Sequence, residues 1–228
     1  MNSLPFVNLS REPEILFTKD SSTVYLYVQK RKSNIFDGFL GFGTNETSGK
    51  LEFDGYLDLK LTNNLNYGES INLIYKSDES EQKTFNANIK VPYIFNSPIG
   101  IELGLGIFKK DSTFTNVSQS ASLFYQINSK QTIYAGLSSI QSNNLTDDNS
   151  LLNIQDYNST FYNLQYQLFK PQYNNLLFPN NFSFDAKIGF GNRKNDGNRL
   201  NQTFHEVNTY KVFNLNQKKN GIVNAMKA

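Results

Sequence analysis

The stretch that decides the fold is LEFDGYLDLKL, residues 51–61, in which side-chain character changes at every step. The odd positions are leucine, phenylalanine or glycine, and the even positions carry mostly charged side chains. Successive side chains of a β-strand point to opposite faces of a sheet, so this pattern predicts a strand with one apolar and one charged face. Such a strand separates either a protein core from water or a lipid bilayer from a water-filled lumen.

The same alternation recurs from about residue 36 to the end of the chain. Clear or weaker versions cover 84–93, 99–108, 120–127, 131–140, 159–169, 182–191, 204–216 and 69–76. Together with a glycine-rich segment at 36–43, these segments predict about ten strands and no amphipathic helix.

The segments between the predicted strands are of two kinds. Tight turns built from turn-forming residues are predicted at 96–98, 128–130 and 218–221. Longer polar loops are predicted at 44–50, 77–83, 109–116, 141–158 and 192–203. An antiparallel meander with short turns at one rim and long loops at the other is the pattern of an outer-membrane barrel.

Composition narrows the classes of function. The chain has 228 residues, of which 38% are hydrophobic and 14% aromatic, and no run approaches the ~18 apolar residues of a membrane helix. The net charge of +2 is spread along the chain, so no nucleic-acid footprint is present. The absence of cysteine excludes disulfides and thiolate chemistry. The N-terminus has no signal-peptide pattern, so an export signal would have been removed or would lie upstream.

A soluble sandwich shows the same alternation, but long strands and a charged second face favour a membrane barrel. Aromatic side chains near the strand ends point the same way. The pattern predicts these lipid-facing residues: Leu51, Phe53, Leu57, Leu59, Phe85, Ile89, Val91, Ile101, Leu103 and Leu105. It predicts these lumen-facing residues: Glu52, Asp54, Asp58, Lys60, Asn88, Lys90 and Glu102.

A series of short motifs lies in a fixed order between residues 34 and 108. They are NIFDGFLGFG at 34–43 with Glu46 and Gly49 after it, NNLNYG at 63–68, Gln82 and Thr84, VPYIF at 91–95 and GIELG at 100–104. In order and spacing they resemble the start of the barrel in the BamA/TamA-type outer-membrane assembly factors, the bacterial surface antigens of the POTRA-barrel superfamily. The later strands resemble those of this family only in their general type, without matching motifs.

The resemblance implies an all-β fold: an antiparallel transmembrane β-barrel of which about ten strands are present out of about sixteen. Residues 1–35 would be the end of a periplasmic POTRA-like module, with its last strand at 23–30 and a linker. Residues 36–228 would be an outer-membrane barrel truncated at its C-terminus. The basic cluster Lys30, Arg31 and Lys32 follows the predicted module strand.

The resemblance also implies a role in the assembly or insertion of other outer-membrane proteins. In this family the first barrel strand pairs weakly with the last, so the seam opens sideways and accepts a nascent strand. The residues implied for that seam strand are Gly38, Phe39, Gly41, Phe42 and Gly43, whose glycines would make it pliable. The alternative is that these glycines only relieve crowding where a barrel bends. Implied partners are outer-membrane lipids, nascent outer-membrane proteins and periplasmic or lipoprotein assembly subunits.

The chain departs from the family at two places. An arginine-bearing Val-Arg-Gly-Phe-like motif is absent, and Arg193 and Arg199 lie in contexts that do not match it. Residues 221–228 look like the start of a further strand without a terminal aromatic residue. Two other functions therefore stay open: a passive channel or secretion transporter, and a soluble β-rich binding domain with 141–158 as its contact loop.

Residues able to carry out chemistry are few. His205 is the only histidine, so a histidine-based metal site or Ser-His catalysis has no second partner. The segment 143–149 is rich in Asn and Asp but lacks the spacing of a calcium loop. We therefore predict no enzyme, no catalytic residue, no metal and no cofactor.

Overall fold

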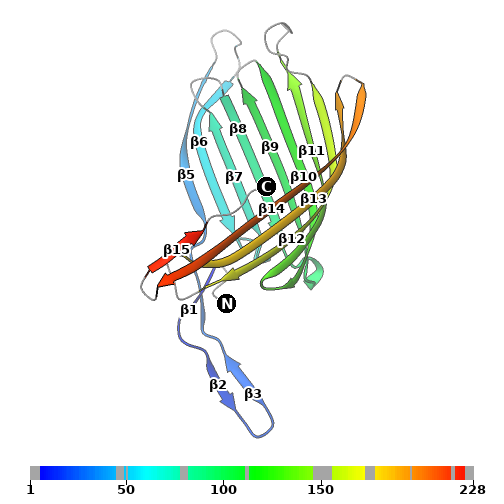
Figure 1. Ribbon diagram of the computed structural model, residues 1–228. Coiled ribbons are helices and arrows are strands. Elements are labelled where there is room, and N and C mark those ends of the chain that lie inside the picture. The colour runs from blue at the N-terminus through cyan, green and yellow to red at the C-terminus, as the bar shows by residue number, and fades with distance from the viewer. Residues whose placement is uncertain are drawn as a thin grey trace.

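The computed structural model describes residues 6–44, 49, 51–77, 82–110, 113–145, 156–172, 178–195, 197–216 and 219–223. Over these residues the chain forms one large antiparallel sheet and two small two-stranded sheets (Figure 1). The single helical element among them is a 3₁₀ turn, η1 (Ile94–Asn96). No helix in this part of the chain is long and apolar enough to span a membrane.

The large sheet is a meander in which each strand pairs with its neighbours in sequence. Its ten long strands are β5 (Ile35–Thr44), β6 (Leu51–Thr62), β7 (Ser70–Ser77), β8 (Gln82–Val91), β9 (Ile99–Lys110), β10 (Phe114–Asn128), β11 (Gln131–Asn144), β12 (Tyr157–Pro171), β13 (Asn180–Asn195) and β14 (Asn198–Asn216). A five-residue strand, β15 (Lys219–Val223), pairs with β14 as an eleventh member. The prediction of about ten antiparallel strands is confirmed.

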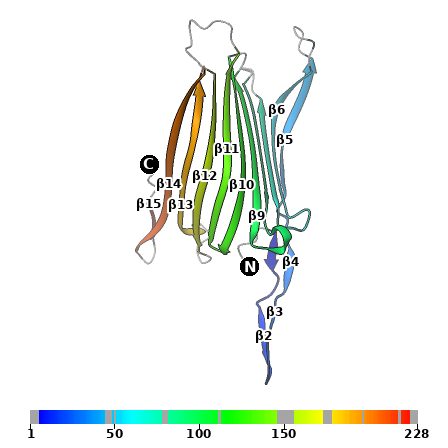
Figure 2. The same ribbon diagram turned by 90° about the vertical axis from the view of Figure 1, so that its right-hand side faces the viewer.

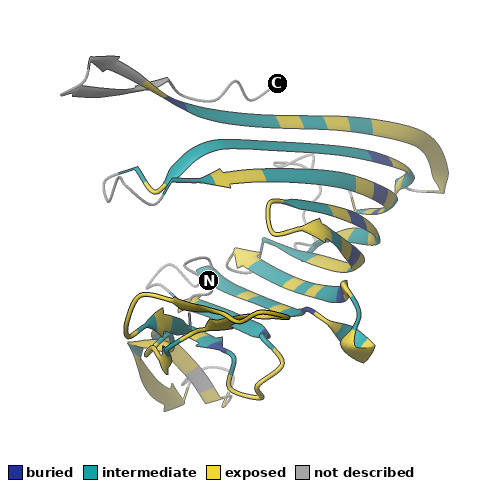
Figure 3. Ribbon diagram, turned by 90° about the horizontal axis from the view of Figure 1, so that it is seen from below, coloured by how far each residue is buried: buried dark blue, intermediate teal, exposed yellow. Residues whose placement is uncertain are grey.

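The sheet is strongly curved but does not close. Viewed along its strands, the sheet follows a wide arc and stays open on one side (Figure 3). The order β15 to β5 is linear, so these two strands are the edges of the sheet. The all-β antiparallel meander is therefore observed, and the closed barrel stays a prediction.

Strand register assigns every side chain of the sheet to one of two faces. Asn72, Ser120 and Lys187 lie on the same face of the sheet in register and line one hollow. The face that they share is therefore the concave one. In register, Leu57 lies beside Tyr75 and Leu103 beside Ile89, on the convex face. The buried hydrophobic side chains of the described residues are only Phe124, Tyr134 and Val212. The sheet therefore has no conventional apolar core.

The hairpin connections differ from those predicted. Residues 109–110 and 114–116 belong to β9 and β10, and 192–195 and 198–203 belong to β13 and β14. Only residues 111–113 and 196–197 remain between these strands, so the two predicted long loops and the predicted alternation of short and long connections are wrong. Asparagine, lysine and arginine at these hairpin ends are paired strand residues, as the opposed pair Asn195 and Asn198 shows.

Two of the predicted turns also need correction, and one is confirmed. The 96–98 turn is the end of a longer connection over 92–98 that contains η1. Lys219, Asn220 and Gly221 lie in β15, and residues 217–218 lie outside the described residues. The turn after Asn128 is confirmed, because β11 begins at Gln131.

The N-terminal residues form two separate ribbons. β2 (Glu14–Phe17) and β3 (Ser22–Tyr25) make a hairpin, and β1 (Val7–Leu9) pairs with β4 (Val28–Lys30). Figure 2 shows the hairpin projecting beyond one rim of the large sheet. The strand predicted at 23–30 is divided into β3 and β4, because the chain changes strand partners at residues 26–27. The POTRA-like module itself stays a prediction.

Candidate functional site: the free edge and the polar concave face

The first strand of the sheet, β5, has one free edge. It pairs with β6 alone, and no other described strand lies against it. Such an edge presents unpaired backbone N–H and C=O groups that can bind another strand. Phe42 on β5 is 78% exposed, so little of the described chain covers this side chain. The predicted seam residues 38–43 all lie in this strand.

The glycines of β5 divide into two groups. Gly38 has φ +152°, and a Cβ there would collide with the carbonyl oxygen of Tyr56 on β6. Gly55 on β6 has φ +122° and approaches the Phe39 carbonyl in the same way. A Cβ at Gly41 would meet only the Asp54 oxygen at 3.8 Å, and at Gly43 it would meet nothing within 4 Å. Relief of crowding therefore accounts for Gly38, while at Gly41 and Gly43 there is space for a side chain.

Charge repulsion weakens the pairing between β5 and β6 further. Asp37 lies directly opposite Asp58 in the ladder, and like charges at opposed positions destabilise a strand pair. The Tyr56 hydroxyl donates to Asp37 Oδ1 at 3.3 Å, and the Tyr56 ring meets Phe39 edge-on at 6.1 Å. The pairing of β5 with β6 thus lacks side chains at Gly41 and Gly43, places two carboxylates opposite each other and includes one aromatic contact.

The ten predicted lipid-facing residues all fall on the convex face. Register places Phe53 beside Phe42, Leu59 in line with Leu105 through Leu73 and Ala87, and Val91 beside Ile101. The six predicted lumen-facing residues with described side chains fall on the concave face, and the Glu52 side chain lies outside the described residues. The structure thus separates the two predicted sets, while the medium that each face meets remains a prediction.

Three of the predicted lumen-facing residues come together at one charged cluster. Lys90 Nζ donates to the Tyr134 hydroxyl at 2.7 Å and lies 3.5 Å from Glu102 Oε2. Asn88 Nδ2 donates to Glu102 Oε1 at 3.0 Å. Lys90 Nζ also lies 4.6 Å from the centre of the Phe124 ring, a cation–π distance. This cluster ties β8, β9, β10 and β11 together on the concave face.

Glycine–aromatic pairs on the concave face were not predicted. Phe124 lies over its register partner Gly100, and a Cβ at that glycine would collide with the ring. The same arrangement joins Phe204 to Gly189 and Phe161 to Gly191. The signal in the sequence is a phenylalanine among the polar-face positions of one strand and a glycine among the polar-face positions of the neighbouring strand. Pairing them requires the register, which a single strand does not reveal.

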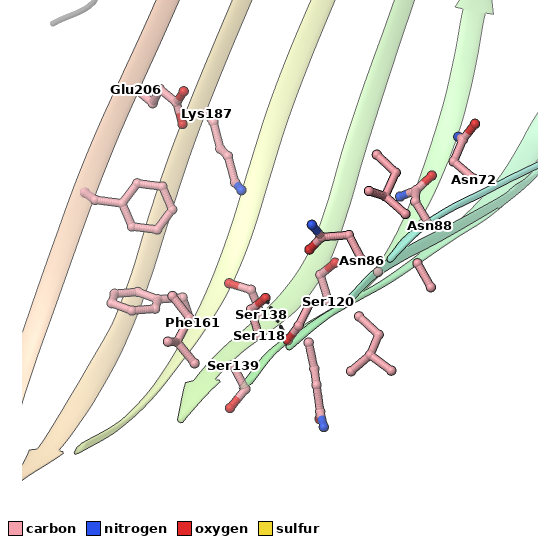
Figure 4. Close-up of a pocket in the computed structure, with 18 residues that line it drawn as sticks. Asn72, Asn86, Asn88, Ser118, Ser120, Ser138, Ser139, Phe161, Lys187 and Glu206 are labelled. Carbon is pink, nitrogen blue, oxygen red and sulfur yellow. Dashed lines mark hydrogen bonds between the residues drawn. The ribbon is translucent and has the colours of Figure 1, made fainter. Parts of the chain in front are cut away.

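Two adjoining hollows open on the concave face between β7 and β14, apart from a third between β5 and β8. The larger, of about 610 Å³, has asparagines of β7 and β8 on one side and Phe161, Phe204 and Lys187 on the other. Figure 4 shows Asn86, Ser118, Ser120 and Lys187 pointing toward the space between the strands. The smaller hollow, of about 200 Å³, is lined mainly by serine and amide side chains.

A second polar cluster lies beside the smaller hollow. Gln165 Nε2 donates to Asp185 Oδ2 at 2.8 Å and Gln167 Nε2 donates to the same oxygen at 2.6 Å. Two amides therefore bind this carboxylate, which forms no ion pair with any described residue. Such saturation holds the side chains of β12 and β13 in fixed positions.

One connection at the rim contains a buried carboxylate. Glu69 is 3% exposed, and its two carboxylate oxygens accept the N–H groups of Leu65 at 2.7 Å and Tyr67 at 3.1 Å. Burial alone would raise the pKa of the Glu69 carboxyl, but these bonds and those from the N–H groups of Glu69 and Asn64 outweigh it. The pKa of Glu69 is consequently lowered from its ordinary value. Glu69 therefore closes the loop between β6 and β7 as a carboxylate.

Of the remaining candidates for chemistry, the structure describes His205 but not most of the acidic loop. No group of three or more His, Asp or Glu able to hold a metal occurs within the part of the chain that the structure describes. His205 stands on the convex side of β14, opposite Ile188. Residues 146–155 of the acidic loop lie outside the described residues.

Comparison with known proteins adds no identification: no protein-family model matches the chain, and no curated protein matches it. The resemblance to the outer-membrane assembly factors therefore stays a prediction based on the motifs at 34–108.

Proposed function

We propose that the chain is part of an outer-membrane β-barrel related to the assembly and insertion factors for outer-membrane proteins. Its convex face would meet lipid and its concave face a wet lumen. The free edge of β5 would accept a strand from a nascent outer-membrane protein when the seam opens sideways. In this proposal further strands complete the barrel to about sixteen.

The observation that carries the membrane part of this proposal is the exposure of the convex face. Leu123 is 57% exposed and Leu164 is 54% exposed, although both lie in the middle of long strands. A continuous apolar surface of this kind is rare on a soluble monomer and marks a contact with lipid or protein. Tyr93, Phe95 and Tyr125 are also exposed near one rim, where aromatic girdles of outer-membrane barrels lie.

The assembly part of the proposal is supported by the edge geometry of β5. An unpaired strand edge is costly in lipid, because its polar groups find no water there. A weakly paired first hairpin lowers the cost of exchanging its partner for an incoming strand. Space for side chains at Gly41 and Gly43 together with the opposed Asp37 and Asp58 supplies that weakness.

Membrane insertion is tested by partition between lipid and buffer. The full chain, refolded with lipid vesicles, should float with them in a density gradient and stay with them after a carbonate wash. The same chain refolded in plain buffer should aggregate. Monodisperse, folded protein in plain buffer would instead favour the soluble β-rich binding domain and overturn the proposal.

Strand capture is tested by disulfide cross-linking, which is clean because the chain has no cysteine. The Gly43→Cys variant should cross-link to an unfolded outer-membrane barrel protein that carries one cysteine in a terminal strand. Ala121→Cys, in the doubly paired β10, is the matched control. Equal cross-linking at both positions, or none at Gly43, would contradict the role assigned to β5.

The polar concave face supports a second candidate function, a passive channel or secretion transporter. Asn72, Asn88 and Lys187 line a hollow that is wide enough for water and small solutes. In planar bilayers a channel would give steady, ohmic conductance without any client protein. An assembly factor would give small or flickering currents and would depend on β5 for cross-linking.

A further inference from the structure

The smaller hollow on the concave face contains an unsatisfied buried acceptor. Asn163 of β12 is 9% exposed, and its Nδ2 donates to Ser138 Oγ at 2.8 Å. Its Oδ1 is buried and has no hydrogen-bond partner among the described residues. A buried acceptor without a donor costs about 1–3 kcal/mol. Because the Asn163 side chain lines this hollow, a molecule bound there can supply the missing donor.

Serine hydroxyls form the neighbouring wall. Ser120 stands opposite Gly104 and Ser122 opposite Gly136, so on those sides no cross-strand side chain covers them. Each hydroxyl can donate one hydrogen bond and accept two. Together with Ser138 they offer donors and acceptors at adjacent positions of β10 and β11.

A cation and an aromatic wall complete the site. Lys187 lines both hollows, and among the described residues ion pairs join only Arg11 to Glu14 and Lys90 to Glu102. Lys187 Nζ lies 5.6 Å from the centre of the Phe204 ring, and Phe204 meets Phe161 edge-on at 5.3 Å. The larger hollow shares Ser120, Ser138 and Lys187 with the smaller one, so the two form a continuous site.

We propose that this site binds a saccharide, with Asn163 Oδ1 accepting a hydrogen bond from a sugar hydroxyl. A sugar ring carries hydroxyls that both donate and accept, which suits the serines and Lys187, and a C–H face that packs against Phe161 and Phe204. A simple anion would pair with Lys187 but would place oxygen against Asn163 Oδ1. An apolar ligand would leave Asn163 and the serines without partners. The inference goes beyond the proposed function and does not depend on the β5 edge.

Calorimetric titration of the full chain, folded in an amine-oxide detergent rather than a sugar-based one, tests the proposal. Maltose and cellobiose should bind saturably with a Kd on the order of 1 mM. Asn163→Leu should weaken binding at least tenfold, and Ser120→Ala, at an exposed position, should weaken it severalfold. Gln141→Leu, which removes an amide from the convex side of β11, should leave binding unchanged.

Circular dichroism of each variant separates lost binding from lost folding, and Ser120→Ala keeps the test decisive if Asn163→Leu does not fold. Absence of saturable binding by either sugar, with the folded wild-type chain, would overturn the proposal and leave water as the occupant. Binding that is equally strong in a folded Asn163→Leu variant, or binding of inorganic phosphate alone through Lys187, would overturn it as well. None of these results bears on flotation or on cross-linking at β5.

Discussion

At the scale of single residues, substitutions at adjacent positions of β6 compare the surroundings of the two faces directly. Leu57, near the middle of the strand, lies on the convex face, and Asp58 lies on the concave face. If the convex face meets lipid, Leu57→Arg should cost about 2–4 kcal/mol, and Asp58→Asn far less. Urea titration of folding into lipid vesicles measures both values. Equal costs would show that the two faces meet the same medium.

The pair Gly100 and Phe124 allows a second test. Phe124 is 1% exposed and occupies the space that a Cβ at Gly100 would need. Gly100→Ala should therefore destabilise the sheet by about 1–3 kcal/mol, because the ring must leave its position. Gly43→Ala is the control, since its Cβ would meet nothing within 4 Å. Unfolding in micelles gives both values, and adding Phe124→Leu to Gly100→Ala should recover part of the loss.

The stability of the folded chain should depend on pH through Glu69. Because its pKa is lowered in the folded chain, its contribution to stability is present above the pKa of the unfolded chain and is lost as pH falls through the folded value. Glu69→Gln should therefore cost about 1.5 kcal/mol or more near neutral pH, where the carboxylate accepts the Leu65 and Tyr67 N–H groups. The difference between the two proteins should shrink in acid. A difference that is constant from neutral pH to strong acid would contradict this role.

At the scale of elements, β5 should be the least protected of the long strands. It pairs on one side, whereas β9 to β13 pair on both sides. Amide hydrogen exchange in micelles should therefore be fast throughout β5 and slow in β10 and β11. Gly41→Val combined with Gly43→Val should slow exchange in β5, because β-branched side chains favour the strand conformation. Protection of β5 equal to that of β10 would show that its free edge is occupied.

The sequence predicts strand number and the two faces well, because both follow from a period of two that each strand carries in its own residues. It predicts hairpin length poorly. Residues 192–195 and 198–203 are mostly polar, and such residues are as typical of a loop as of the polar end of a strand. The candidate saccharide site could not be predicted. Asn163, Ser120 and Lys187 come from three strands, and only the register and the curvature of the sheet bring them to one hollow.

At the scale of the whole molecule, the sheet is open, with β5 and β15 as its edges. Closed outer-membrane barrels have no free edges, because every backbone group is paired around the ring. An open sheet lacks that completeness, so we expect the full chain, folded in detergent, to unfold in sodium dodecyl sulfate without heating. Heated and unheated samples should then migrate alike on a gel, while a closed barrel of similar size runs faster unheated. A heat-modifiable band from this chain alone would show that its edges pair with each other, and β5 would then have no free edge to offer a client strand.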